Sequence, residues 1–168
     1  MAAEPWAVVA LRTYVFHVIP MANPDGVVNG LGRLTSPQGA DLVFWPATEN
    51  SAHRAIVEAT DRVRSKLNVT FHNWQNKHSD GLLGFDPHIR KRFLRFMPDQ
   101  VAFVKQWYIK DPQPFSQERP KRELQRVYCY REFGAVSVSY EFSWFGRTPD
   151  DVRDTGRKAL WALLRALD

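Results

Sequence analysis

Three groups of polar residues follow apolar segments of the chain, and their types are those that hydrolytic chemistry uses. The first is Asn23-Pro24-Asp25-Gly26, after the apolar run 14–19, with Arg33 seven residues beyond the glycine. The second is His72 with the amides after it, and the third is Glu141. A histidine can bind a metal ion, a carboxylate can take a proton from water, and an arginine can stabilise an oxyanion.

Glu141 lies in a segment whose side chains alternate between large and small. In a strand, Glu141 shares its face with Ala135, Ser137, Ser139 and Ser143, whereas the opposite face carries Val136, Val138, Tyr140, Phe142 and Trp144. A carboxylate on a face of small side chains has the open space that a catalytic base needs. The same alternation is typical of a solvated outer face, so both interpretations stay open.

His72 ends an apolar segment, and the amides after it could hold the imidazole in one tautomer. This position suits a zinc ligand and also a histidine that merely caps a strand. Catalytic zinc normally needs three protein ligands and an open position for water. The sequence contains no His-x-x-Glu, His-Glu-x-x-His or Cys-x-x-Cys motif. The remaining histidines are poorer candidates because they fall in a predicted strand, a predicted helix or loops: His17, His53, His78 and His88.

The spacing of apolar residues predicts the elements that would position these groups. Strands are predicted at 14–19, 69–71, 124–130 and 135–142, and helices at 51–67, 87–96, 98–108 and 149–167. Residues 21–50 and 109–122 are predicted loops. This order predicts an α/β fold, with a mixed, mainly parallel sheet flanked by helices in a single domain over residues 1–168. Ligand sites in such folds lie beyond strand ends, so we expect the three polar groups to share one cleft.

Composition narrows the class of protein. The 168 residues are 44% hydrophobic, which suits one domain with a real core. No stretch approaches the roughly 18 apolar residues of a membrane span, so no membrane contact is expected. The single Cys129 excludes an internal disulfide, and it suits either a reducing compartment such as the cytoplasm, where we expect the protein, or indifference to redox state. We predict Cys129 to be a buried strand residue. The net charge of +5 permits acidic partners without requiring them.

One basic segment raises the possibility of phosphate contacts. It reads HIRKRFLRF, and its basic residues are His88, Arg90, Lys91, Arg92 and Arg95. Apolar residues interleave at helical spacing, which favours the solvated face of an amphipathic helix. Nucleic-acid binding is therefore not expected.

Taken in order, YVFHVIPMANPDGVVNGLGRL, HNWQN and FGAVSVSYE resemble the zinc carboxypeptidase family, with its carboxypeptidase A-like fold, and most closely its cytosolic-carboxypeptidase and bacterial relatives. The resemblance extends from about Leu11 over nearly the whole chain. It implies zinc-dependent hydrolysis of peptides, with His72 as a ligand of one zinc ion and Glu141 as the catalytic glutamate. It also implies that Arg33 polarises the scissile carbonyl, and that Asn23 and Arg33 lie on the rim that binds substrate.

The sequence departs from the family pattern at two places. The family's first two zinc ligands come from a His-x-x-Glu motif upstream of Asn-Pro-Asp-Gly, so this chain resembles the latter part of the catalytic domain. The family also continues with Gly-x-Asp-Leu-Asn-Arg, whose Asn and Arg bind the terminal carboxylate, whereas Val43 and Phe44 stand here. Recognition of a free C-terminus is thus left open. Tyr128 and Tyr130 are the candidates for the family's substrate-facing tyrosine.

Two further expectations follow from these departures. The alternative to an enzyme is a non-catalytic, zinc-free module with a carboxypeptidase-like fold that binds peptides. If strands of the family's sheet are missing, a sheet edge and apolar surface should be exposed, and self-association is then expected.

Overall fold

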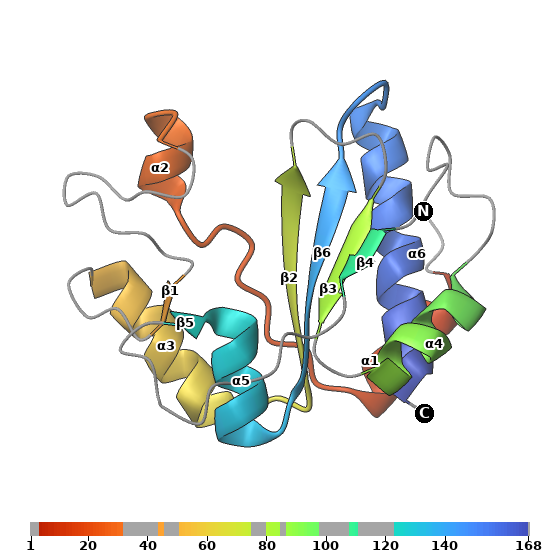
Figure 1. Cartoon of the computed structure of the whole chain (residues 1–168), viewed down its shortest axis with the longest axis horizontal. Helices are drawn as coiled ribbons and strands as arrows, with labels where there is room; N and C mark the ends of the chain where they lie inside the picture. The colour runs from red at the N-terminus through yellow and green to blue at the C-terminus, as the bar shows by residue number, and fades with distance from the viewer. Residues whose placement is uncertain are drawn as a thin grey trace. The chain divides into compact units, whose positions relative to one another are not determined.

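A computed structural model describes residues 4–31, 44–45, 51–74, 80–84, 87–97, 108–110 and 123–167 (Figure 1). The chain divides into two compact units. The first unit comprises Met1–His17, Val69–Gln113 and Val138–Asp168, and the second comprises Val18–Asn68 and Pro114–Ser137. Among the described helices, none is long and apolar enough to cross a membrane.

A four-stranded sheet lies mainly in the first unit, while the first two residues of two of its strands belong to the second. Its strands are β2 (Leu67–Trp74), β6 (Val136–Ser143), β3 (Gly81–Gly84) and β4 (Tyr108–Lys110), and they are hydrogen-bonded in that order. Strand β3 runs antiparallel to β6 and parallel to β4. The arrows of β2 and β6 point the same way in Figure 1. The sheet is therefore mixed and mainly parallel, as the sequence predicted.

Helices α4 (Pro87–Phe96) and α6 (Pro149–Leu167) cover the sheet face that carries Tyr140 and Phe142. The ring of Phe93 on α4 is fully buried, and its centroid lies 6.3 Å from that of Tyr140 in an edge-on contact. Gly156 on α6 lies against the Phe142 ring, which a Cβ at this position would meet at 3.5 Å. Aromatic rings and small helical residues thus form the core on this face.

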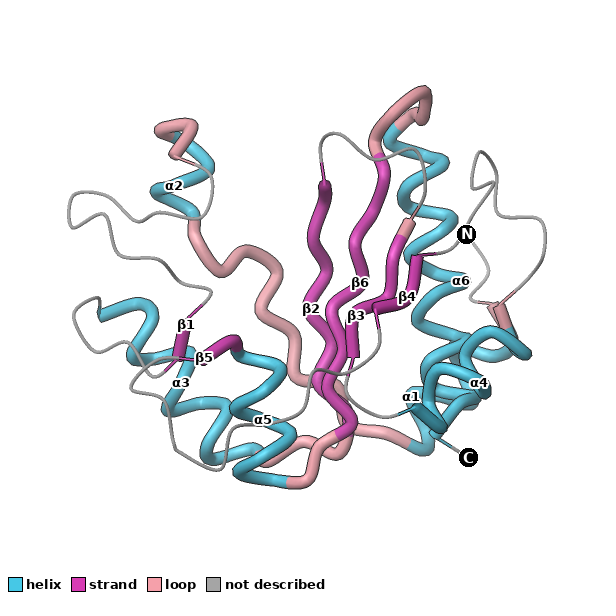
Figure 2. The backbone as a smooth tube through the Cα atoms, viewed as in Figure 1, coloured by secondary structure: helices cyan, strands magenta, loops and turns pink. Residues whose placement is uncertain are grey.

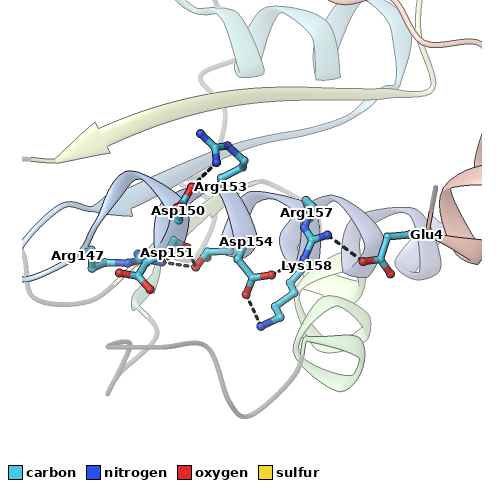
Figure 3. A network of polar contacts seen from close by, with 9 residues as sticks. Glu4, Arg147, Asp150, Asp151, Arg153, Asp154, Arg157 and Lys158 are labelled. Carbon is cyan, nitrogen blue, oxygen red and sulfur yellow. Dashed lines mark hydrogen bonds and ion pairs between the residues drawn. The ribbon is translucent and has the colours of Figure 1, made fainter. Parts of the chain in front are cut away.

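The N-terminal helix α1 (Pro5–Thr13) also belongs to the first unit and was not anticipated from the sequence. Glu4, directly before it, accepts a hydrogen bond from Arg157 of α6 over 2.8 Å. Figure 3 shows this contact, with Asp154 and Lys158 nearby on α6. Both partners of the Glu4–Arg157 pair are about half exposed, so the pair adds little to stability.

The second unit contains α2 (Pro24–Val28), β1 (Phe44–Trp45), α3 (Ser51–Val63), β5 (Glu123–Leu124) and α5 (Gln125–Phe133). Strands β1 and β5 form a short antiparallel ladder. The Tyr128 hydroxyl on α5 donates to Asp61 Oδ1 on α3 over 2.8 Å, and the Arg64 guanidinium lies 5.6 Å from the centre of the Phe133 ring. These contacts join α3 to α5.

Two predicted strands are wrong. Residues 14–19 lie outside any helix or strand, in the loop between α1 and α2 in Figure 2, and Val15 and Val18 are 84% and 75% exposed. Their apolar pattern suits a strand, but a strand needs a ladder partner, and no described strand pairs with them. His17 is therefore not inside a strand.

Residues 125–130, predicted as part of a strand over 124–130, lie in α5 instead. Gly134 ends this helix in the left-handed conformation, with φ of 64°, where its amide donates to the Tyr130 carbonyl. Cys129 is buried as predicted, but in a helix. The alternation of apolar residues over this short segment was compatible with both structures, and the glycine stop signal was the better guide.

Most of the other predicted helices and strands within the described residues are present in the structure. Helices α3, α4 and α6 and strands β2 and β6 lie where the sequence predicted them, with two differences in their bounds. Helix α3 ends at Val63 rather than at residue 67, and β2 covers Leu67–Trp74 rather than only 69–71. Residues 24–28, predicted as loop, form the short α2. Tyr108–Lys110 form β4 rather than a helix end and a loop. The predicted helix at 98–107 and the predicted loop at 111–122 lie outside the described residues.

Candidate active site

Glu141 lies near the end of β6, directly opposite Gly81 of β3. It is half-buried, and the serines on its face are nearly inaccessible: Ser137, Ser139 and Ser143. The small residues beside Glu141 therefore do not form a solvated outer face. That part of the alternative interpretation is wrong.

The pairing of β2 with β6 brings His72 to the same place. The Val136 amide donates to the Lys66 carbonyl over 2.9 Å. In a parallel ladder, an amide bonds to the carbonyl of the residue before its partner, so Leu67 is the partner of Val136. Five residues further along both strands, His72 stands beside Glu141, and both side chains point to the same face.

Side-chain contacts agree with this register along the strands. Asn68 Nδ2 donates to Ser137 Oγ over 3.0 Å, which joins neighbouring residues on the face of His72 and Glu141. On the other face, the Phe71 ring centroid lies 6.3 Å from that of Tyr140 and 5.7 Å from that of Phe142. The register therefore holds up to the residue before His72.

This arrangement places an imidazole next to a carboxylate at one end of the sheet. His72 is exposed and Glu141 is half-buried, so a substrate or metal ion can approach the imidazole while the carboxylate is held on a central strand. An imidazole can ligate a metal, and a neighbouring carboxylate can take a proton from a metal-bound or free water. The pair is suited to hydrolysis.

The described residues fit one part of a zinc site and do not complete it. His72 offers a neutral nitrogen of the kind that zinc prefers. Within the described ranges, however, no group of three or more histidine, cysteine, aspartate or glutamate side chains could hold a metal ion. Further ligands would have to come from outside these residues.

Asn23 lies in the second unit, where its side chain has a structural task. Its Oδ1 accepts a hydrogen bond from the Gly26 amide over 3.1 Å and so caps α2, with Pro24 in the first turn. The Asn-Pro-Asp-Gly sequence thus forms the start of a short helix. Arg33, predicted to be aimed by this segment, lies outside the described residues, as does Val43; Phe44 is in β1.

The candidate tyrosines Tyr128 and Tyr130 both lie on α5. Tyr128 donates its hydroxyl hydrogen to Asp61. Burial, followed by the hydrogen bond and the charge of Asp61, raises the pKa of Tyr128 to about 12. This hydroxyl is therefore engaged within the second unit.

A buried ion pair near Glu141 was not anticipated from the sequence. Asp80, just before β3, and Arg147, just after β6, have fully buried side chains and are joined at 2.8 Å. The Tyr140 hydroxyl donates to the same carboxylate over 2.7 Å, and burial, with the nearby Asp80 charge, strongly raises the pKa of Tyr140. Asp80 and Arg147 are far apart in the sequence and match no motif, so no sequence signal joins them.

Comparison with known proteins gives a likeness of fold. No protein-family model matches the sequence, and no curated protein matches it. A metallo-carboxypeptidase from Burkholderia cenocepacia is 22% identical, with a TM-score of 0.64 over 98% of this chain and 48% of its own. A metallo-carboxypeptidase from Pseudomonas aeruginosa, solved in complex with (2-guanidinoethylmercapto)succinic acid, is 17% identical, with a TM-score of 0.61 over 89% of this chain and 44% of its own.

These matches confirm the predicted carboxypeptidase-like fold. The chain spans less than half the length of either solved structure. At this level of identity the likeness concerns the fold, and the chemistry has to be argued from the residues.

Proposed function

We propose that this chain supplies part of the active site of a zinc-dependent, metallocarboxypeptidase-type peptide hydrolase. The observation that supports this most is the register of β2 on β6, which sets His72 beside Glu141 in a fold similar to that of solved metallo-carboxypeptidases. A potential zinc ligand and a potential base on adjacent strands are the two groups that such chemistry requires side by side. The order of the three sequence motifs supports the same function.

In this proposal each residue has a separate role. Glu141 takes a proton from the attacking water and passes it to the leaving amine. His72 holds one position of the metal, and Arg33 donates to the oxyanion while Asn23 lies on the substrate rim. When bound, zinc lowers the pKa of water and polarises the scissile carbonyl.

The substrate in this proposal is a peptide or protein. The apolar Val43 and Phe44 cannot clamp a carboxylate, so other groups anchor the peptide. Cys129 is the single cysteine and is buried in α5, which is compatible with the reducing cytoplasm, where we place the protein.

A zinc titration of the purified chain by calorimetry tests the role of His72. We expect any zinc that the chain binds to depend on His72, so that His72→Ala abolishes the binding. The matched control is His88→Ala, which removes an exposed histidine of α4 and should leave the titration unchanged. Zinc binding that survives His72→Ala would contradict the assignment of this residue.

A second candidate function is a zinc-free module that binds peptides without cleaving them. It is favoured by the lack of a three-ligand group within the part of the chain that the structure describes. It predicts that no zinc binds in the titration, and that peptide binding is unchanged by a chelator. Peptide binding that is lost with the chelator would exclude this candidate.

A further inference from the structure

The end of β6 is fixed by one buried carboxylate. Asp80 accepts three hydrogen bonds: from the Tyr140 hydroxyl over 2.7 Å, from the Ser143 amide over 2.8 Å and from Arg147 Nη1 over 2.8 Å. The side chains of Asp80 and Arg147 are both fully buried. An ion pair removed from water in this way requires well-formed hydrogen bonds. The Asp80 carboxylate and both Nη atoms of Arg147 have them, whereas Arg147 Nε is buried without a hydrogen-bond partner among the described residues.

Arg147 extends the same network into α6. Its Nη1 also donates to the Ser143 carbonyl over 3.1 Å, and its Nη2 donates to the Asp151 carbonyl over 3.3 Å and to Thr155 Oγ1. Figure 3 shows Arg147 beside Asp151 at the start of this helix. The planar guanidinium thus joins the last residue of β6 to the first turns of α6, a geometry that lysine cannot reproduce.

The network lies on both sides of Glu141 without including it. Tyr140 precedes Glu141 and Ser143 follows it by two residues, and both bind Asp80. Gly81, the neighbour of Asp80 in the sequence, is the partner of Glu141 in the β3–β6 ladder. The backbone that carries Glu141 is therefore held before, after and opposite this residue.

We propose that Asp80 and Arg147 are positioning residues that keep Glu141 beside His72. Catalytic groups must be held to within roughly 0.5 Å by residues that are themselves fixed by packing and hydrogen bonds. Asp80 and Arg147 are fixed in this way, because both are fully buried and hydrogen-bonded. The inference rests on the proposed function, because the placement of Glu141 matters only if it acts on a substrate near His72.

NMR of the full chain tests this inference without an activity assay. The probe is the ring signal of His72, assigned with His72→Ala and recorded at a fixed alkaline pH at which imidazoles are neutral. We expect Glu141→Gln to move this signal, because the two side chains are neighbours. The same substitution is then made in an Asp80→Asn background, where we expect most of this change in chemical shift to be lost.

The matched control removes two ion pairs within α6, neither of which reaches β6. Asp154→Asn breaks the contacts of Asp154 with Arg157 and Lys158 and should leave the effect of Glu141→Gln on His72 intact. If Asp80→Asn does not fold, Tyr140→Phe is the decisive background, since it removes only the hydroxyl that binds Asp80. A loss of stability alone does not alter the signals of the folded protein. A purely structural role of Asp80 therefore predicts that Glu141→Gln moves the His72 signal equally with and without Asp80→Asn.

The outcomes separate this inference from the proposed function. The positioning role is overturned if Glu141→Gln moves the His72 signal as far in the folded Asp80→Asn or Tyr140→Phe background as in the otherwise unaltered chain. The proposed function is unaffected by that result. If Glu141→Gln fails to move the His72 signal in the otherwise unaltered chain, the two residues are not neighbours. The proposed function then loses its main support, and the positioning role fails with it.

Discussion

The Val136 amide donates to the Lys66 carbonyl over 2.9 Å, and this hydrogen bond sets the register of β2 against β6. Because side chains alternate strictly along a strand, a shift of one residue would turn His72 away from the face of Glu141. The contact of Phe71 with Tyr140 and Phe142 on the other face opposes such a shift. The packing of the aromatic face thus determines the geometry of the candidate active site.

Glu141→Gln should abolish most peptide hydrolysis, since an amide cannot take a proton from water. General base catalysis is worth about 10² to 10⁴ in rate, so a loss in this range is expected. The free energy of unfolding should change by only about 0.5 kcal/mol, because the substitution is isosteric. Hydrolysis of a peptide library, followed by mass spectrometry, measures the effect. Glu132→Gln on α5 is the control, and undiminished hydrolysis in Glu141→Gln would exclude this residue as the base.

Phe93→Ala should destabilise the protein by about 3–5 kcal/mol, because it leaves a cavity against Tyr140 where α4 packs on the sheet. Urea unfolding followed by circular dichroism measures this loss. Its neighbour Leu94 is 41% exposed on the same helix, so Leu94→Ala should cost much less. Equal losses for the two variants would mean that α4 does not pack as described.

Tyr128→Phe should change how stability depends on alkaline pH. The pKa of this hydroxyl is raised from 10.0 to about 12 in the folded protein, by burial first and then by Asp61. A raised pKa means that the contribution is complete below pH 10 and is lost as the pH rises to about 12. The stability difference between the parent chain and Tyr128→Phe should therefore shrink across this range. Denaturant unfolding at pH 9 to 12 tests it, and a constant difference would contradict the contact with Asp61.

Val15→Lys combined with Val18→Lys should reduce self-association of the chain. Both side chains are largely exposed, so apolar surface is available to a second copy. Sedimentation velocity at several concentrations measures the association. Ala52→Lys adds charge at an exposed position of α3 and should have no comparable effect. A parent chain that stays monomeric at all concentrations would refute this expectation.

The sequence was most informative where a structural signal is local. Thr148 and Asp151 bond to each other's backbone amides at the start of α6, and Thr148-Pro149-Asp150-Asp151 predicted that helix start. The alternation around Glu141 likewise predicted β6 and its two faces. These signals depend on residues a few positions apart, so they can be read without knowledge of the fold.

Long-range relationships were beyond such reasoning. The apolar residues 14–19 suit a strand, yet their conformation depends on a partner that no described residue provides. Asp80 and Arg147 are an acid and a base in unrelated segments, and only the sheet brings them together. For the site, the residue types at His72 and Glu141 suggested the chemistry, whereas their adjacency required the pairing of β2 with β6.

The strand order β2-β6-β3-β4 also has a consequence for synthesis of the chain. Strand β6 inserts between β2 and β3, although both of these precede it in the sequence. From Trp74 to Ser143, a ribosome adding 5–20 residues per second needs roughly 3–14 s. During this interval β2 and β3 lack their common neighbour, so the nascent chain presents open strand edges that a chaperone could bind until β6 emerges.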